Sequence, residues 1–286
     1  MKTLIISDLH FNRDKSILPY CLHICKHLGI IAEIMHVVDP RNIQGKYTPI
    51  SDSQSVSAGV MDHDEIMKKE TLESRSAIEK YLSRELSVLN FPLETAVIVE
   101  KGYSEEVFVK KINTSKIELV MINGKPENKD GILFNDISYL VEHTNCPFLF
   151  VPHGMKFKIP KHVAFIDESE IIKTDTVCTA IELMKPYNPF CFIIHQMKKY
   201  NEFSGTVFCE QVNRNISRNE NVNIEFIRSD NPLESLTGLN KEIGLDIVFI
   251  LKLKKNMLEK LFTRKTPYKV TEKLGVPSVV LPSHEN

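Results

Sequence analysis

The chain has 286 residues and a formal net charge of −1, with 42% hydrophobic and 26% charged residues. This composition is typical of a globular protein large enough for two ordinary domains, and it excludes a general electrostatic attraction to nucleic acid or to an anionic membrane surface. No stretch reaches the roughly 18 consecutive apolar residues that would span a bilayer, and the N-terminus lacks the cleavage pattern of a secretory signal. The six cysteines show no metal-binding arrangement, so we expect buried free thiols in a cytoplasmic protein.

Strand and helix patterns alternate through the first half of the chain. Short apolar runs rich in Ile and Val are typical of parallel strands that are buried on both faces. They predict strands at 3–8, 31–37, 94–99, 117–122 and 147–151. Helical periodicity predicts helices between them at 15–28, 62–89, 103–115 and 134–144. This alternation with short connections favours right-handed crossovers and a doubly wound parallel sheet.

One long polar segment, at 40–61, interrupts this alternation. It is rich in turn-forming residues, and loops of such length are usually either partly disordered or functional lids. Both interpretations stay open from the sequence.

The second half of the chain repeats the organisation of the first. In each half an apolar run ends in an aspartate, at Asp8 and at Asp167. A second apolar run then ends in a histidine, His36 or His195, and the spacing from aspartate to histidine is the same in both halves. Strands are accordingly expected at 162–167, 190–196, 222–228, 246–251 and 277–281. We interpret the chain as a duplication, with a first domain at 1–152, a linker at 153–160 and a second domain at 161–286.

The carboxyl ends of the strands are where an open α/β sheet binds its ligands. Asp8 and Asp167 would lie at such ends, where an aspartate could accept a hydrogen bond from a ribose hydroxyl or an adenine amine. The same two residues could instead only cap the helix or turn that follows them. His36 and His195 also end strands, and we interpret them as structural.

Several stretches of the chain share a pattern with a known family. The first half contains AEIMHVVDP, ELVMING and VEHTNCPFLFVP, and the second half contains LDIVFIL and GVPSVVLP. Together they resemble the universal stress protein family in its tandem, two-domain form, over nearly the whole chain. The resemblance implies that each half is a five-stranded parallel sheet of order 3-2-1-4-5 flanked by helices. It also implies an internal pseudo-dimer joined through the fifth strands, which would remove two exposed sheet edges, and it is compatible with a further homodimer.

Nucleotide-binding members of that family carry the motif G-x2-G-x9-G-[ST] after the fourth strand, where the glycines let the backbone approach phosphate groups. The corresponding stretch here is NGKPENKDGILFND. Asn123 takes the first glycine position, with Gly124 beside it, and Pro126 takes the second. Phe134 and Asn135 stand at the closing Gly-Ser. Because proline lacks a backbone N–H and phenylalanine fills space that phosphate oxygens need, the motif is interpreted as degraded.

The second half keeps the spacing of this motif but none of its residues, because the four motif positions hold Leu251, Lys254, Arg264 and Lys265. A backbone cradle for phosphate is implausible without glycine. A basic cluster surrounds these positions, and it could attract an anion through its side chains or form a solvated helix face. Its members are Lys252, Lys254, Lys255, Lys260, Arg264, Lys265, Lys269 and Lys273.

No catalytic or metal-binding arrangement is predicted. His23 and His27 lie four residues apart on an expected helix, but no third ligand accompanies them, which favours a surface or core role over a metal site. No nucleophile is paired with a base in a recognisable motif, and no stripe of aromatic and basic residues suggests nucleic-acid binding. The sequence therefore favours a protein that is not an enzyme.

These patterns together favour a non-enzymatic regulatory or binding module in a stress response, which acts with an unidentified protein partner and without a cofactor. The alternative is an adenine-nucleotide sensor that uses the first domain only, binds ATP or AMP weakly, hydrolyses ATP slowly if at all, and closes the 40–61 segment over its site. The residues expected to contact a nucleotide are Asp8, Val37, Asn123, Gly124 and Asn135, with Asp167 as the counterpart in the second half.

Overall fold

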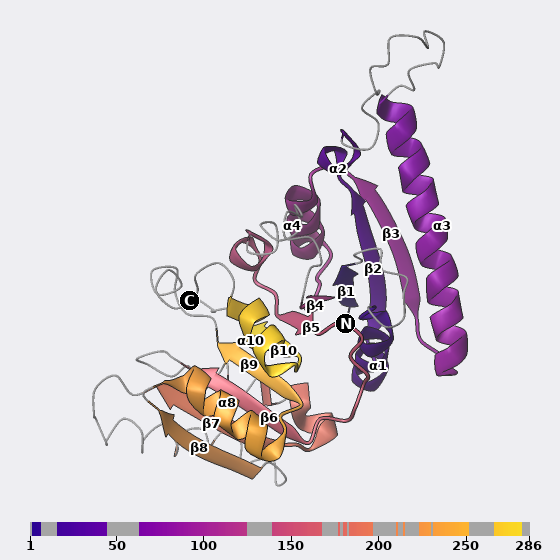
Figure 1. Cartoon of the computed structure of the whole chain (residues 1–286). Coiled ribbons are helices and arrows are strands. Elements are labelled where there is room, and N and C mark those ends of the chain that lie inside the picture. The colour runs from indigo at the N-terminus through magenta and orange to yellow at the C-terminus, as the bar shows by residue number, and fades with distance from the viewer. Residues whose placement is uncertain are drawn as a thin grey trace. The chain divides into compact units, whose positions relative to one another are not determined.

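The computed structural model describes residues 2–6, 16–44, 63–124, 139–167, 177, 180–181, 183–196, 210, 214, 223–229, 231–251 and 266–281. The chain divides into two compact units, Met1–Val120 with Pro126–Thr144 and Met121–Lys125 with Asn145–Asn286. Both units are α/β, with mainly parallel strands flanked by helices (Figure 1). The predicted fold class is therefore confirmed.

Strands β1, β2 and β3 of the first unit are parallel. β2 (Ile31–Val38) pairs with β1 (Lys2–Ile6) on one side and with β3 (Thr95–Lys101) on the other. The strand order continues from β1 to β4 (Leu119–Asn123), whose first residues belong to this unit. Side chains of β1 and β2 are buried almost throughout, as expected for strands that are covered on both faces.

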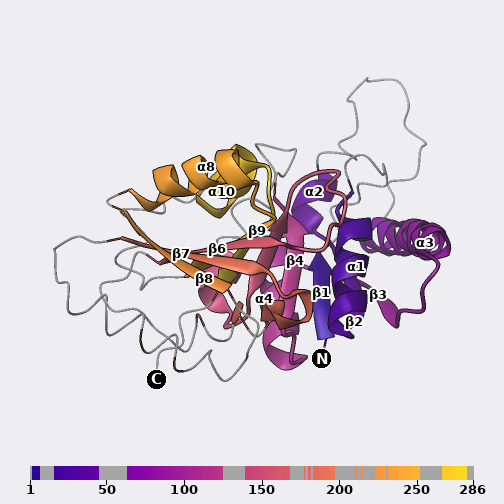
Figure 2. The ribbon, with the colours of Figure 1, turned by 90° about the horizontal axis from the view of Figure 1, so that it is seen from below.

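Among the described residues, the first unit contains helices α1 to α4 and the helical residues 139–143. α1 (Leu18–Leu28) begins three residues later than predicted, with a proline in its first turn, where the missing N–H costs no hydrogen bond. It ends at Gly29, whose φ of 64° is the left-handed conformation that terminates many helices. α1 and α3 (His63–Leu89) lie on one side of the strands and α4 (Ser104–Thr114) on the other (Figures 1 and 2). The short helix α2 (Pro40–Gln44) follows β2.

A buried carboxylate ties β1, β2 and α4 together. Glu33 on β2 is 5% exposed, and it forms ion pairs with Lys2 at 3.1 Å and with Lys111 at 2.7 Å. Burial by itself would raise the pKa of Glu33, but the hydrogen bonds from Lys111 and Lys2 outweigh it and lower the pKa below its ordinary value. Glu33 is therefore charged and internally neutralised at physiological pH.

Within the described residues, the second unit contains six whole strands and the end of β4. They are β5 (Phe148–Val151), β6 (His162–Asp167), β7 (Phe190–Gln196), β8 (Asn223–Ser229), β9 (Ile247–Leu251) and β10 (Ser278–Leu281). Their order is β5-β10-β9-β6-β7-β8. The strands of the first half follow the order β3-β2-β1-β4-β5 and those of the second half β8-β7-β6-β9-β10. Each half thus has the predicted order 3-2-1-4-5.

The fifth strands of the two halves pair with each other. β5 and β10 are antiparallel, with Phe150 beside Ser278 and Phe148 beside Val280, whereas β10 and β9 are parallel. All four residues of each of these strands are buried. The pairing therefore satisfies an edge on each strand that would otherwise expose backbone N–H and C=O groups.

Helices of the second unit are described in part. η1 (Lys185–Tyr187) precedes β7, and α8 (Pro232–Ile243) follows β8 with the side chain of Asn231 accepting a hydrogen bond from the N–H of Glu234 at 3.4 Å. α10 (Thr266–Leu274) lies between β9 and β10 in the chain and packs against β10 and β5. None of the helices within the described residues is long and apolar enough to cross a membrane.

Most predicted elements lie within two residues of their observed bounds. The first strand, predicted to reach residue 8, is described only to Ile6, and residue 8 lies outside the described residues. The helix predicted at 134–144 is described from 139 to 143. Four of the six cysteines are described, and all four are buried and outside any disulfide, as predicted: Cys21, Cys25, Cys146 and Cys191. Burial raises the pKa of Cys25 and of Cys191 to about 12.

The Glu33 ion pairs predict unequal roles for the two lysines. Lys111→Ala removes the more buried partner, whose side chain is 17% exposed, and should lower the free energy of unfolding by about 3 kcal/mol, because a buried carboxylate loses most of its compensation. Lys2→Ala, at a side chain that is 45% exposed, should cost less than about 1 kcal/mol. Denaturant unfolding of the two variants measures both, and equal losses would contradict these roles.

Candidate functional site

The structure describes three of the predicted first-half site residues. Val37 lies near the carboxyl end of β2, where it is 5% exposed and pairs with Glu100 of β3. Asn123 is the last residue of β4 and is 7% exposed, and Gly124 follows it directly. Asp8, Asn135 and the remainder of the predicted phosphate loop lie outside the described residues, as does the 40–61 segment beyond Gln44.

In the second half, the aspartate and the histidine that end the first two strands are neighbours. Asp167 ends β6 and lies beside His195 of β7 in the strand register. Only the backbone of these two positions is described. In this half, the aspartate-to-histidine spacing found in the sequence therefore places the two residues side by side on paired parallel strands.

The backbone of Gly124 is closed in by neighbouring elements of the second unit. Its N–H donates a hydrogen bond to the carbonyl oxygen of Val151, at 2.7 Å. A Cβ atom at this position would lie 2.5 Å from Cγ2 of Thr271 and 3.1 Å from the Val151 oxygen. Because real Cβ atoms essentially never approach another heavy atom this closely, packing alone requires glycine here. The glycine that suggested a phosphate loop is thus explained by the approach of β4 to β5 and α10.

A polar cluster at the carboxyl end of β2 was not predicted from the sequence. The side chain of Asp39 is fully buried, and its Oδ2 accepts hydrogen bonds from the backbone N–H of Ser104, at 2.9 Å, and from the Ser104 hydroxyl, at 3.0 Å. Ser104 is the first residue of α4, and the N-cap residue Tyr103 makes no side-chain cap. Asp39 therefore caps α4 from a different part of the chain, and its charge lies where the helix dipole favours an anion.

Arg41 holds this carboxylate in place. Its backbone N–H and its Nε donate to Oδ1 of Asp39, each at 2.9 Å, and its Nη2 donates to Oδ2 at 2.6 Å. The same guanidinium bonds both oxygens of Glu105, at 3.1 and 2.6 Å, and lies 5.2 Å from the ring centre of Tyr103. This bidentate geometry to two carboxylates is the one that arginine forms most strongly.

The electrostatics of the cluster follow from these contacts. Burial would raise the pKa of Asp39, but the hydrogen bonds from Arg41 and Ser104 outweigh it and lower the pKa to about 2. The pKa of Arg41 is raised, chiefly by its hydrogen bond to Asp39. Two carboxylates thus surround one guanidinium, and the cluster carries a net negative charge at pH 7. Such a cluster repels a phosphate group rather than attracting it.

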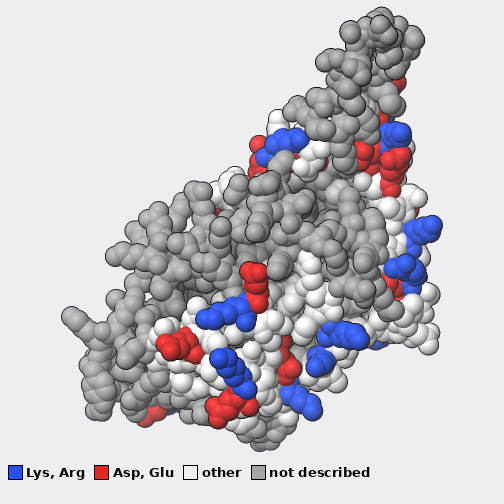
Figure 3. Space-filling view, in the orientation of Figure 1, with Lys and Arg blue, Asp and Glu red and all other residues white. Residues whose placement is uncertain are grey.

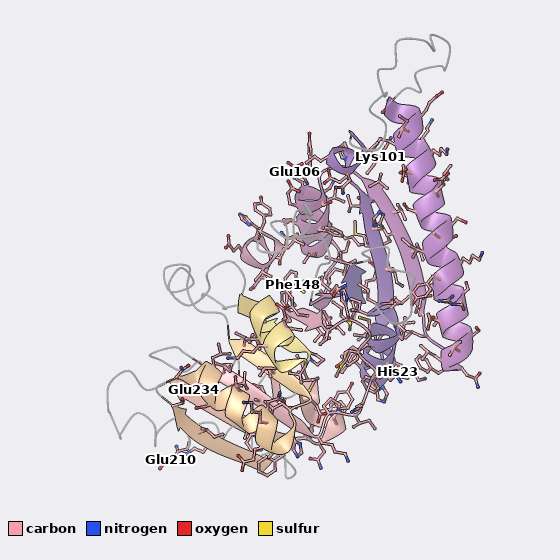
Figure 4. The ribbon with its side chains drawn as sticks, viewed as in Figure 1. His23, Lys101, Glu106, Phe148, Glu210 and Glu234 are labelled. Atoms are coloured by element: carbon pink, nitrogen blue, oxygen red, sulfur yellow. The ribbon has the colours of Figure 1, made fainter. Side chains whose placement is uncertain are left out.

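Further charges of both signs lie at the same rim of the first unit. Lys101 ends β3 and Glu106 lies in the first turn of α4 (Figure 4). Along α3, acidic and basic side chains are intermixed (Figure 3). Of the basic cluster predicted between Lys252 and Lys273, most lies outside the described residues.

The histidine pair on α1 has the local structure expected of a helix surface. The Nδ1 atom of His27 lies 2.8 Å from the carbonyl oxygen of His23. The ring of His23 packs beside Phe91, with 5.4 Å between the ring centres. Partial burial, and then the proximity of His27, lower the pKa of His23. Within the described part of the chain, no group of three or more metal-ligating side chains is present.

Comparison with known proteins identifies the fold. A universal stress protein from Archaeoglobus fulgidus matches with 14% identity and a TM-score of 0.65, over 99% of this chain and 98% of that one. A putative universal stress protein from Pseudomonas aeruginosa matches with 10% identity and a TM-score of 0.55, over 98% and 93% of the two chains. The cytoplasmic domain of a prokaryotic cation chloride cotransporter matches with 12% identity and a TM-score of 0.52, over 100% and 96%. No protein-family model and no curated protein matches. The chain therefore has the fold of universal stress proteins.

The pKa of Asp39 predicts how stability depends on pH. Because its folded pKa is depressed from 3.8 to about 2, the stabilisation is complete above the unfolded pKa and is lost as the pH falls through the folded one. Asp39→Asn should therefore lower the free energy of unfolding at pH 7 by about 2 kcal/mol and flatten its pH dependence between about pH 4 and pH 2.

Glu105→Gln is the matched control, since this carboxylate contacts the same guanidinium but is 24% exposed. It should cost less than about 1 kcal/mol. Denaturant unfolding across this pH range measures both variants, and an unchanged pH slope in Asp39→Asn would refute the assignment.

Proposed function

We propose that this protein is a non-enzymatic regulatory module of a stress response, that it acts by binding a protein partner in the cytoplasm, and that it binds adenine nucleotides weakly or not at all. The observation that carries this proposal is the environment of Gly124, whose N–H is already bonded to Val151 and whose α-carbon is enclosed by Thr271. A phosphate cradle requires several backbone N–H groups that point at the ligand. At the start of the motif, this chain uses that donor for its own packing.

The Asp39 cluster supports the same proposal. In an open α/β sheet, the carboxyl ends of the strands and the N-termini of nearby helices are the usual places for an anionic ligand. At α4 the first backbone N–H is bonded to Asp39, and Glu105 adds a second negative charge. An incoming phosphate would have to displace a buried carboxylate that Arg41 holds through three hydrogen bonds.

A non-enzymatic role agrees with the state of the buried carboxylates. Asp39 and Glu33 are both buried, and both have a lowered pKa because of cations and donors from the chain itself. A general base needs a pKa near the working pH and contact with a substrate. Neither carboxylate meets these conditions, since each is ionised, enclosed and committed to structural partners.

Binding of a protein partner is proposed from the fold. Fold alone does not fix function, but this architecture occurs both in universal stress proteins and as the cytoplasmic domain of a cation chloride cotransporter. It is therefore compatible with a module that acts through another protein.

A second candidate is an adenine-nucleotide sensor that uses the first half. The buried Asn123 at the end of β4 favours it, since an amide at that position could bond a ligand without a glycine-rich cradle. In this reading Val37, Asp8 and Asn135 would complete the site.

The two candidates predict different responses to ATP. On the main proposal, no adenine nucleotide is released when the purified protein is heat-denatured, and 5 mM MgATP raises the melting temperature by less than about 1 °C, because a ligand stabilises only in proportion to its occupancy. Mass analysis of the supernatant and a thermal melt measure these outcomes.

A stabilisation of several degrees would overturn the main proposal in favour of the sensor. Asn135→Ala should then reduce the shift, whereas Lys254→Ala in the second half should leave it unchanged. Loss of the shift in Lys254→Ala alone would place the site in the second half instead.

A further inference from the structure

The end of β4 is built into the second unit although it belongs to the first half of the sequence. Residues Met121–Lys125 group with Asn145–Asn286, while the preceding residues of β4 group with the first unit. β4 therefore passes from one unit to the other within a single strand. Gly124, which follows β4 directly, contacts residues of the second unit.

Two elements of the second unit enclose Gly124. Val151, the last residue of β5, accepts the hydrogen bond from the Gly124 N–H at 2.7 Å. Thr271, on α10, places its methyl group 2.5 Å from the position of a Cβ atom. We call Gly124, Val151 and Thr271 the β4–α10 junction. It joins residues that are far apart in the sequence and come from both halves of the chain.

Thr271 is itself fixed from several sides. It is 1% exposed, and its hydroxyl is hydrogen-bonded to that of Ser278 on β10, which is fully buried. One turn further on, the carbonyl of Leu274 accepts a hydrogen bond from Asn240 of α8 at 3.3 Å. A shift of α10 at Thr271 would therefore disturb the contacts of this helix with both β10 and α8.

We propose that the β4–α10 junction is a coupling point through which the end of β4, in the first half, and helix α10, in the second half, hold each other in position. Close-packed interiors transmit displacement because a neighbour that must give way moves its own contacts in turn. A partner that displaces the end of β4 therefore also displaces α10, and one that binds α10 acts on the end of β4. The proposal goes beyond the regulatory role proposed above and does not depend on nucleotide binding.

A double-mutant cycle in the full chain tests this coupling. Gly124→Ala should raise the unfolding equilibrium constant about tenfold or more, because the new methyl group collides with Thr271. Thr271→Ser deletes only Cγ2 and keeps the hydroxyl that bonds Ser278. In the Thr271→Ser background, Gly124→Ala should therefore raise the unfolding equilibrium constant by a factor at least about three times smaller than in the parent chain.

Gly238→Ala is the matched control for a glycine-to-alanine change. Gly238 lies inside α8, and a Cβ atom there would meet nothing within 4 Å. This substitution should leave stability unchanged or raise it slightly, and it should show no dependence on residue 271.

Hydrogen exchange distinguishes coupling from general destabilisation. In Gly124→Ala, amides of α10 should exchange faster under native conditions, whereas those of β2 and β3 should keep their parental rates. The proposal is overturned if Thr271→Ser gives no rescue, or if α10 exchanges at its parental rate while Gly124→Ala is destabilised.

Discussion

The antiparallel pairing of β5 with β10 is the constraint on which much of the second unit depends. A parallel sheet ends in an edge strand with unpaired backbone groups, and such edges invite unwanted association. Here each fifth strand supplies the partner of the other, and all residues of both strands, β5 and β10, are buried. Val151 directly follows the paired residues of β5, and α10 packs against both strands. These two then define the space around Gly124. Packing between the halves thus determines the backbone of β4 at its carboxyl end.

The ends of strands in this fold are normally the places where ligands bind, yet at the described ends of β2 and β4 the chain bonds its own groups. Val151 accepts the hydrogen bond of the Gly124 N–H. Asp39 accepts a hydrogen bond from the N-terminus of α4 and another from Arg41. These are two unrelated interactions in different units, and both remove a donor that an anion would need. Their combination supports the proposal of a binding module without a tight nucleotide site.

Local sequence patterns predict most of the fold but little of the candidate site. Strands such as 31–38 are short apolar runs, which the sequence reveals directly, and their order followed from a resemblance that the comparisons support. Asp39 and Ser104 are 65 residues apart in the sequence, so no local motif predicts their contact. The sequence places Gly124 in a predicted loop. The requirement for glycine at this position comes from the proximity of Thr271, which only the folded chain shows. The described residues do not reach Asp8 or Asn135, whose roles stay predictions.

The most direct test of this account is the exchange rate of the Gly124 amide, measured by NMR with and without MgATP. If the chain uses this N–H for its own packing, the amide exchanges slowly in the nucleotide-free protein, and ATP changes neither its rate nor its chemical shift. Fast exchange without nucleotide, followed by strong protection when ATP is added, would show that the amide serves a phosphate group and would contradict the account.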